Sequence, residues 1–123
     1  EAKFPGSSWL QELMNTNLCM GLFFTNDSGE INRANIFIPT DRSSSAGMLP
    51  ACVIEETAQI MGLPNDSDAV KPSIFNDQSR YFELTDHDRR MLKMLYDPRI
   101  TPGMPRQEAL RQGRLILDEL TRR

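Results

Sequence analysis

The sequence predicts an α+β domain in which an antiparallel hairpin packs on a central helix and two more helices follow. The hairpin is indicated by two apolar segments, 18–25 and 31–38, joined by the turn-forming residues 26–29. The first segment is nearly continuous, which suits a buried strand, and the second alternates between apolar and polar residues. The central helix is indicated by apolar residues at helical spacing over 51–62.

The composition is that of an ordinary single domain. The chain has 123 residues, of which 39% are hydrophobic and 25% are charged, so we expect one core. The formal net charge of −3 gives no sign of a nucleic-acid partner. No apolar run approaches the roughly 20 residues that a membrane helix needs, so we expect no transmembrane segment.

Two segments before the central helix are less regular. Residues 7–15 fit a short packing helix with Ser7 or Ser8 as its N-cap. Residues 39–50 are rich in serine, with glycine and proline, and we interpret them as a mobile connecting loop. We assign both segments structural roles.

The central helix is expected to be buried over most of its circumference. Its apolar residues surround the axis: Val53, Ile54, Ala58, Ile60 and Met61. Gly62 is expected to end it, since glycine readily adopts the left-handed conformation at this position. Pro64 then prevents the helix from continuing.

Two helices are predicted after a polar, irregular segment. The helix over 84–96 has Thr85 as N-cap and Asp88 at the N3 position, a capping-box variant. The helix over 106–121 directs a set of apolar residues to the core: Ala109, Leu110, Ile116, Leu117 and Leu120. The apolar triplet Ser73-Ile74-Phe75 predicts a tight turn packed under the central helix.

Two adjacent acids lie in the apolar central helix, where charged residues are rarely placed without a partner. Glu55 and Glu56 are followed by Gln59, which shares a helix face with Glu55. One interpretation is a hydrogen-bonded polar cluster with candidate partners Gln59, Asn65, Asn76, Arg33 and Arg80. The other is a reactive acid pair with separated pKa values. Cys19 and Cys52 fit a disulfide or two buried thiols.

The acids also fit a spacing known from zinc peptidases. In a His-Glu-x-x-His helix, two ligands lie one turn apart beside a general base, and a glycine turns the chain toward a third ligand. Here Glu56 holds the base position and Gly62 holds the turn position. The ligand positions are held by Glu55, Gln59 and Asn65. The stretch 52–96 therefore resembles a matrixin-like (metzincin, zincin) peptidase core without its histidines.

The triplet 73–75 strengthens this resemblance, because such enzymes carry a methionine turn there, and Phe75 stands in for the methionine. A second set of motifs runs along the chain: Glu-Glu-x-x-Gln-x-x-Gly-Leu-Pro-Asn-Asp over 55–66, Ser73-Ile74-Phe75-Asn76-Asp77, Leu84-Thr85, Leu95-Tyr96-Asp97-Pro98 and Pro102-Gly103-Met104. In these motifs the chain is similar to a bacterial family of exported or lipid-anchored proteins that is classified only as a domain of unknown function. The similarity covers about residues 17–120.

These resemblances imply a zincin-like fold, with residues 1–123 forming the C-terminal part of a larger zincin-like domain. They imply a bacterial envelope or secreted location, either periplasmic or lipid-anchored. Since disulfides persist in such compartments, we predict a bond between Cys19 and Cys52 that joins the first strand to the central helix.

The residues at the ligand positions argue against the peptidase chemistry. One carboxylate and two carboxamides form a poor zinc set, so we expect no metal and no other cofactor. We favour a non-catalytic exported binding or accessory protein, a pseudo-peptidase with a peptide or protein partner. The alternatives are a hydrolase that uses Glu55 and Glu56, with Glu56 as the catalytic base, and a structural subunit of an envelope assembly.

Overall fold

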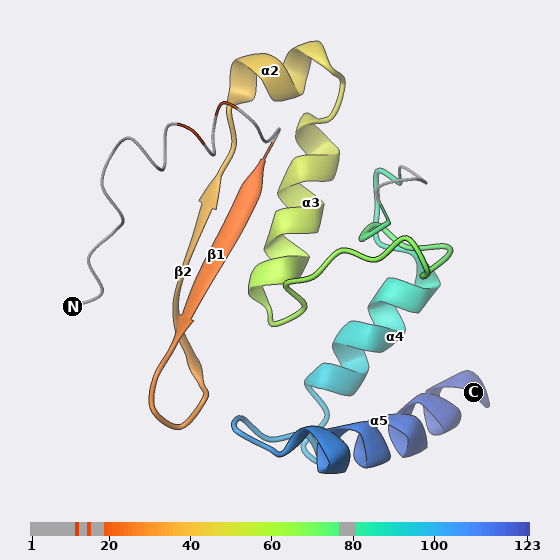
Figure 1. Ribbon diagram of the computed structural model, residues 1–123. Helices are drawn as coiled ribbons and strands as arrows, with labels where there is room; N and C mark the ends of the chain where they lie inside the picture. Colours follow the sequence, from red (N-terminus) through yellow and green to blue (C-terminus); the bar gives the residue numbers. More distant parts are fainter. Residues whose placement is uncertain (1–11, 13–14, 16–18, 77–80) are drawn as a thin grey trace.

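The structure is a computed structural model, which describes residues 12, 15, 19–76 and 81–123 (Figure 1). These residues form the strands β1 (Met20–Thr25) and β2 (Ile31–Phe37) and the helices α2 (Thr40–Ser45), α3 (Leu49–Ile60), α4 (Asp86–Leu95) and α5 (Arg106–Thr121). The predicted α+β class with two C-terminal helices is confirmed. The helix expected over 7–15 lies outside the described residues, except for Glu12 and Asn15.

The two strands form the expected antiparallel hairpin. Their register runs from Met20 opposite Phe37 to Phe24 opposite Arg33, and the ladder is irregular next to Thr25. The turn is closed by the side chain of Asn26. Its carboxamide oxygen accepts hydrogen bonds from the backbone N–H groups of Ser28, at 3.0 Å, and Glu30, at 2.9 Å. Local turn chemistry therefore sets the hairpin as the sequence predicts.

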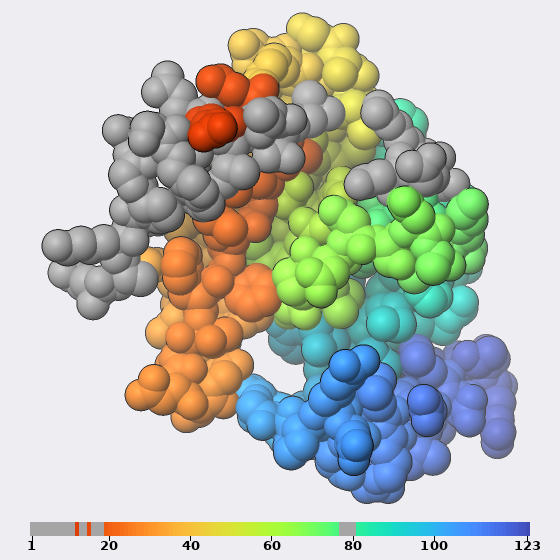
Figure 2. All heavy atoms as spheres, in the orientation of Figure 1, coloured from red at the N-terminus to blue at the C-terminus, as the bar shows by residue number. Residues whose placement is uncertain are grey.

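Helix α3 lies between the hairpin and α4 and supplies the centre of the fold (Figure 1). On one side it packs against the hairpin. On the other it meets the turn 73–75, where Ala58, Ile74 and Phe75 form a buried cluster. In the space-filling view, the green segment that follows α3 covers part of this helix (Figure 2). The predicted position of the turn beneath the central helix is confirmed.

The interpretation of residues 39–50 as a connecting loop was wrong for most of the segment. Residues 40–45 form α2, and α3 already begins at Leu49, with Pro50 in its first turn, where no backbone donor is needed. Ser43 is fully buried, with its hydroxyl 3.9 Å from the sulfur of Cys52. Packing against α3 thus orders a segment whose composition is typical of a loop.

Two helices are less buried than predicted. Val53 is 45% exposed and Met61 is 41% exposed, so α3 has a solvent face and is not enclosed on most sides. On α5, Ile116 is buried but Leu110 is 48% exposed. The core of this small domain is therefore narrow, and it covers only part of each apolar helix. Among the helices of the described residues, none has the length and apolar character needed to cross a membrane.

Candidate functional site

The base position of the predicted motif lies where α3 contacts Gly21 of β1. A Cβ atom added to Gly21 of β1 would lie 3.0 Å from Oε2 of Glu56 and 3.0 Å from Cγ2 of Ile60. The backbone N–H of Gly21 donates a hydrogen bond to the carboxylate of Glu56. The absence of a side chain at residue 21 thus lets the strand contact the helix at its acidic position. Gly21 was not predicted to be part of the site.

Glu56 is a buried acid that holds its proton near neutral pH. It is 5% exposed, and within the described part of the chain Oε2 has no hydrogen-bond partner. Burial raises the pKa of Glu56 from 4.5 to about 7, the negative charge of Asp66 adds to the increase, and the N–H of Gly21 opposes it. This acid can therefore exchange a proton around pH 7.

This raised pKa makes the stability of the protein depend on pH. Between pH 4.5 and about 7 the native state holds the Glu56 proton more tightly than the unfolded chain does, so rising pH favours unfolding. Glu56→Gln removes this titration. As the pH rises through this window, the free energy of unfolding of the variant should increase by up to about 3 kcal/mol relative to that of the native protein. Urea unfolding of both proteins at several pH values measures the difference between their free energies of unfolding. A difference that does not change with pH would contradict the raised pKa of Glu56.

The three ligand-like positions are held in different ways. The side-chain N–H of Gln59 donates to Oδ1 of Asp66 over 2.7 Å. Asn65 is exposed. Glu55 is half-buried, and one of its carboxylate oxygens lies within 4.8 Å of both a Glu56 oxygen and the Cys19 sulfur. The structure thus brings together the two adjacent acids, whereas Gln59 is paired with Asp66, which was not among its predicted partners.

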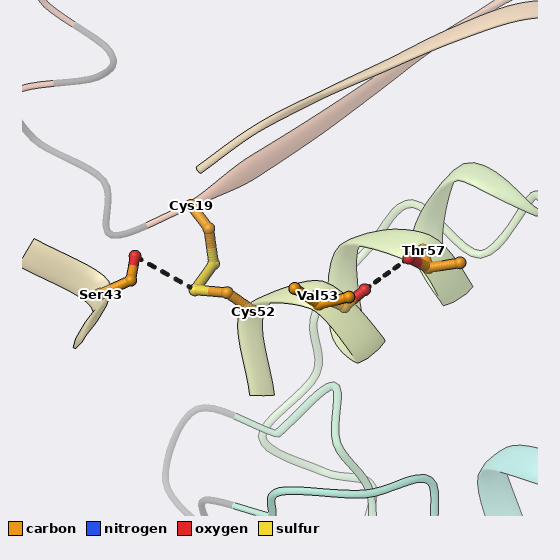
Figure 3. Close-up of a disulfide and its surroundings, with 5 residues drawn as sticks. All are labelled: Cys19, Ser43, Cys52, Val53 and Thr57. Atoms are coloured by element: carbon orange, nitrogen blue, oxygen red, sulfur yellow. Dashed lines mark hydrogen bonds between the residues drawn. A yellow bond between two sulfur atoms is a disulfide. The ribbon is translucent and has the colours of Figure 1, made fainter. Parts of the chain in front are cut away.

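The predicted disulfide between Cys19 and Cys52 is present and joins the start of β1 to the first half of α3 (Figure 3). The Cα atoms of the two cysteines are 5.9 Å apart. In the close-up, the hydroxyl of Ser43 points to the Cys52 sulfur from α2 (Figure 3). The covalent link therefore holds the strand, the helix and the acids of α3 in one arrangement.

The turn 73–75 is held from α4 by the carboxylate of Asp88, which is fully buried. Oδ1 accepts from the hydroxyl of Ser73 at 2.6 Å, and Oδ2 accepts from the N–H of Ile74 at 2.8 Å. The predicted capping box with Thr85 is confirmed. Burial by itself would raise the pKa of Asp88, but the hydrogen bonds, first that from Ser73, together keep this pKa below 3.8. The second role of Asp88, as the hydrogen-bond acceptor for the turn 73–75, was not predicted.

Gly62 ends the site helix with a backbone conformation that other residues rarely adopt. Its φ is +122°, and an added Cβ would lie 3.1 Å from Cδ2 of Leu95. We expect Gly62→Val to lower the free energy of unfolding by about 2 to 4 kcal/mol, because the backbone strain and the steric clash with Leu95 act together. Glu56→Leu should cost less, because it replaces a buried carboxyl group by an apolar one. Thermal unfolding of both variants at neutral pH tests this order, and the reverse order would show that the turn tolerates a side chain.

The residues at the ligand positions do not fit zinc. Gln59 offers a carboxamide that already donates to Asp66, and a carboxamide is a poor zinc ligand. The third nearby group, the sulfur of Cys19, belongs to a disulfide and carries no thiolate charge. The arrangement keeps a polar contact between α3 and the loop after it, and we derive no metal-dependent step from it.

The chain belongs to the family described as Protein of unknown function (DUF2927), because residues 5–113 match the model of that family. This confirms the expected membership of a family of unknown function. Comparison with curated proteins and with solved structures found no match. The resemblance to zinc peptidases therefore rests on the motif spacing alone.

Proposed function

We propose that this chain is a non-catalytic binding domain on a zincin-like frame, which acts in an oxidising compartment such as the bacterial envelope. The observation that carries the proposal is the hydrogen bond from Gln59 to Asp66 at 2.7 Å, at the position where a peptidase would hold its metal. The neighbouring base position supports it, because Glu56 is buried against Gly21. The disulfide is compatible with an exported protein.

The binding surface that we propose is the edge of β1 next to α3. In the sheet of the described residues, β1 pairs with β2 alone. The N–H of Gly21 is already bonded to Glu56, so an extended peptide could add as a third strand along the part of β1 that follows Gly21. Phe23 and Thr25 of β1 line a cavity of about 460 Å³ that continues to Met61 at the end of α3. The other apolar residues of this cavity are Ile31, Leu95, Tyr96, Pro98, Ile100 and Pro102. Its polar residues include Glu30, Asp97 and Thr101. Main-chain pairing would supply affinity, and this cavity would select an apolar side chain.

A selection from a random peptide library, followed by calorimetry with the best peptide, tests this proposal. We expect Met61→Glu to weaken binding at least tenfold, because it replaces an apolar lining residue of the cavity by a charged one. Val53→Glu is a matched control, since Val53 is an equally exposed apolar residue of the same helix outside the cavity. Failure to select any peptide, or equal affinities for the native protein and Met61→Glu, would refute the proposal.

A hydrolase that uses Glu56 is a second candidate, favoured by one observation. A carboxyl group with a pKa of about 7 can act as an acid or a base at neutral pH. If a hydrolysed substrate is found, Glu56→Gln should reduce kcat by at least a hundredfold. Unchanged turnover by this variant would exclude the hydrolase.

A further inference from the structure

Four side chains with zinc-binding chemistry converge where β1 begins beside α3. Glu55 and Glu56 lie three and four residues after Cys52 on α3, so each of them is a neighbour of Cys52 on the helix surface. Cys19 reaches this surface from the start of β1 and is bonded to Cys52 (Figure 3). The Cys19 sulfur and one carboxylate oxygen each from Glu55 and Glu56 all lie within 4.8 Å of one another. This group differs from the motif positions Gln59 and Asn65.

The redox state of the cysteines decides what this group can bind. As a disulfide, the two sulfurs carry no charge and are poor metal ligands. As thiolates, they would complete a set of two sulfur and two carboxylate ligands, all of which zinc accepts. With zinc–sulfur bonds of about 2.3 Å and zinc–oxygen bonds of about 2.0 Å, sulfur and oxygen ligands lie roughly 3.5 Å apart in a tetrahedron. The Cys19 sulfur and the two carboxylate oxygens, which lie within 4.8 Å of one another, therefore need shifts of up to about 1 Å. The Cys52 sulfur is not part of this group of three, and it must rotate toward the acids after its bond to Cys19 is broken.

A second observation points to a cation at this place. Oε2 of Glu56 has no partner among the described residues, and the Glu56 side chain is almost completely buried. A buried oxygen without a partner is costly, and a bound cation would satisfy it. Cys52 lies in the first half of α3, where the positive end of the helix dipole favours a thiolate.

We propose that reduction of the Cys19–Cys52 disulfide creates a zinc site whose ligands are Cys19, Cys52, Glu55 and Glu56. A dithiol reductant donates two electrons, the sulfur–sulfur bond breaks, and the reductant closes into its own disulfide. Its two protons pass to the cysteine sulfurs. Zinc then displaces these thiol protons, together with any proton on Glu56, into solvent. The resulting site has the same formal charge as a structural site of four cysteines.

The site gives the domain two alternative links at one position. In oxidising surroundings the disulfide ties β1 to α3 and excludes zinc. Under reducing conditions zinc would tie the same two elements together and preserve the edge of β1. The inference does not depend on peptide binding, since it concerns the reduced protein only.

Zinc content measured in both redox states tests the inference. The intact chain is reduced with a phosphine under anaerobic conditions, incubated with zinc, and freed of excess metal by gel filtration. We expect about one zinc per chain in the reduced protein and less than about 0.1 in the oxidised protein. Cys52→Ser should abolish tight binding. Glu56→Gln should weaken binding at least tenfold in competition with a chromophoric chelator, whereas the exposed control Glu83→Gln should leave it unchanged.

If the reduced chain unfolds without metal, the unfolding midpoint measured with and without zinc still tests the inference. Zinc should then raise the unfolding midpoint of the reduced protein, or restore its fold, and leave the oxidised protein unaffected. Three results would overturn the inference: no stoichiometric zinc in the reduced chain, equal affinities for the native protein and Glu56→Gln, or equally tight binding by the reduced chain in urea.

Discussion

Replacing Asp88 with alanine is expected to destabilise the protein by about 3 to 5 kcal/mol, one of the two largest effects that the structure implies. The carboxylate accepts from Ser73 at 2.6 Å, from Ile74 at 2.8 Å and from Thr85 at 3.0 Å. Its removal leaves the buried donors of Ser73 and Ile74 without this acceptor. It also removes the N3 half of the α4 capping box, while the Thr85 side chain still caps the helix. Urea unfolding at neutral pH measures the loss.

The matched control for this prediction is Asp86→Ala, because Asp86 is an exposed acid in the same helical turn. It should cost less than about 1 kcal/mol, mostly through the helix dipole. The pKa of Asp88 lies below 3.8 in the folded protein, so its contribution is present above that pH and declines as the pH falls further. The difference between the free energies of unfolding of Asp88→Ala and the native protein should therefore become smaller at acidic pH. Equal losses for the two variants would contradict the account.

Removal of the disulfide by the double substitution Cys19→Ser and Cys52→Ser is expected to cost about 3 to 4 kcal/mol. The bond closes a loop with a sequence separation of 33 residues, so its loss frees the unfolded chain considerably. Urea unfolding in the presence of a chelator measures the effect without a contribution from metal binding.

Reduction of the native protein in the same buffer is the control for this second prediction. It should lower the unfolding midpoint by a similar amount, because both changes remove the same covalent link. A midpoint that moves in neither experiment would show that packing alone holds β1 to α3.

Features set by neighbouring residues could be predicted from the sequence. The hairpin follows from Asn26 and the residues around it, and the capping box follows from Thr85 and Asp88. Both depend on hydrogen bonds across four residues or fewer. Helix α2 was missed because its stability depends on the burial of Ser43 against Cys52, a packing contact that composition does not show.

The chemistry of the site could be predicted only in part. Motif spacing placed Glu55, Glu56 and Gln59 on one helix, but it could not show which acid pairs with Gln59. That partner, Asp66, lies beyond the turn at Gly62, and its position depends on how the loop folds back. The approach of Gly21 to Glu56 is likewise a contact between a strand and a helix. A glycine within an apolar strand was the available signal for such an approach.

Zinc content of the disulfide-bonded protein tests most directly whether the chain keeps a peptidase frame without its donors. The native protein should carry no stoichiometric zinc. The triple variant Glu55→His, Gln59→His, Asn65→His should bind one zinc at least tenfold more tightly than a control with histidines on the exposed face, Val53→His, Thr57→His, Asn65→His. Stoichiometric zinc in the native protein, or equal affinities for the two triple variants, would contradict the account.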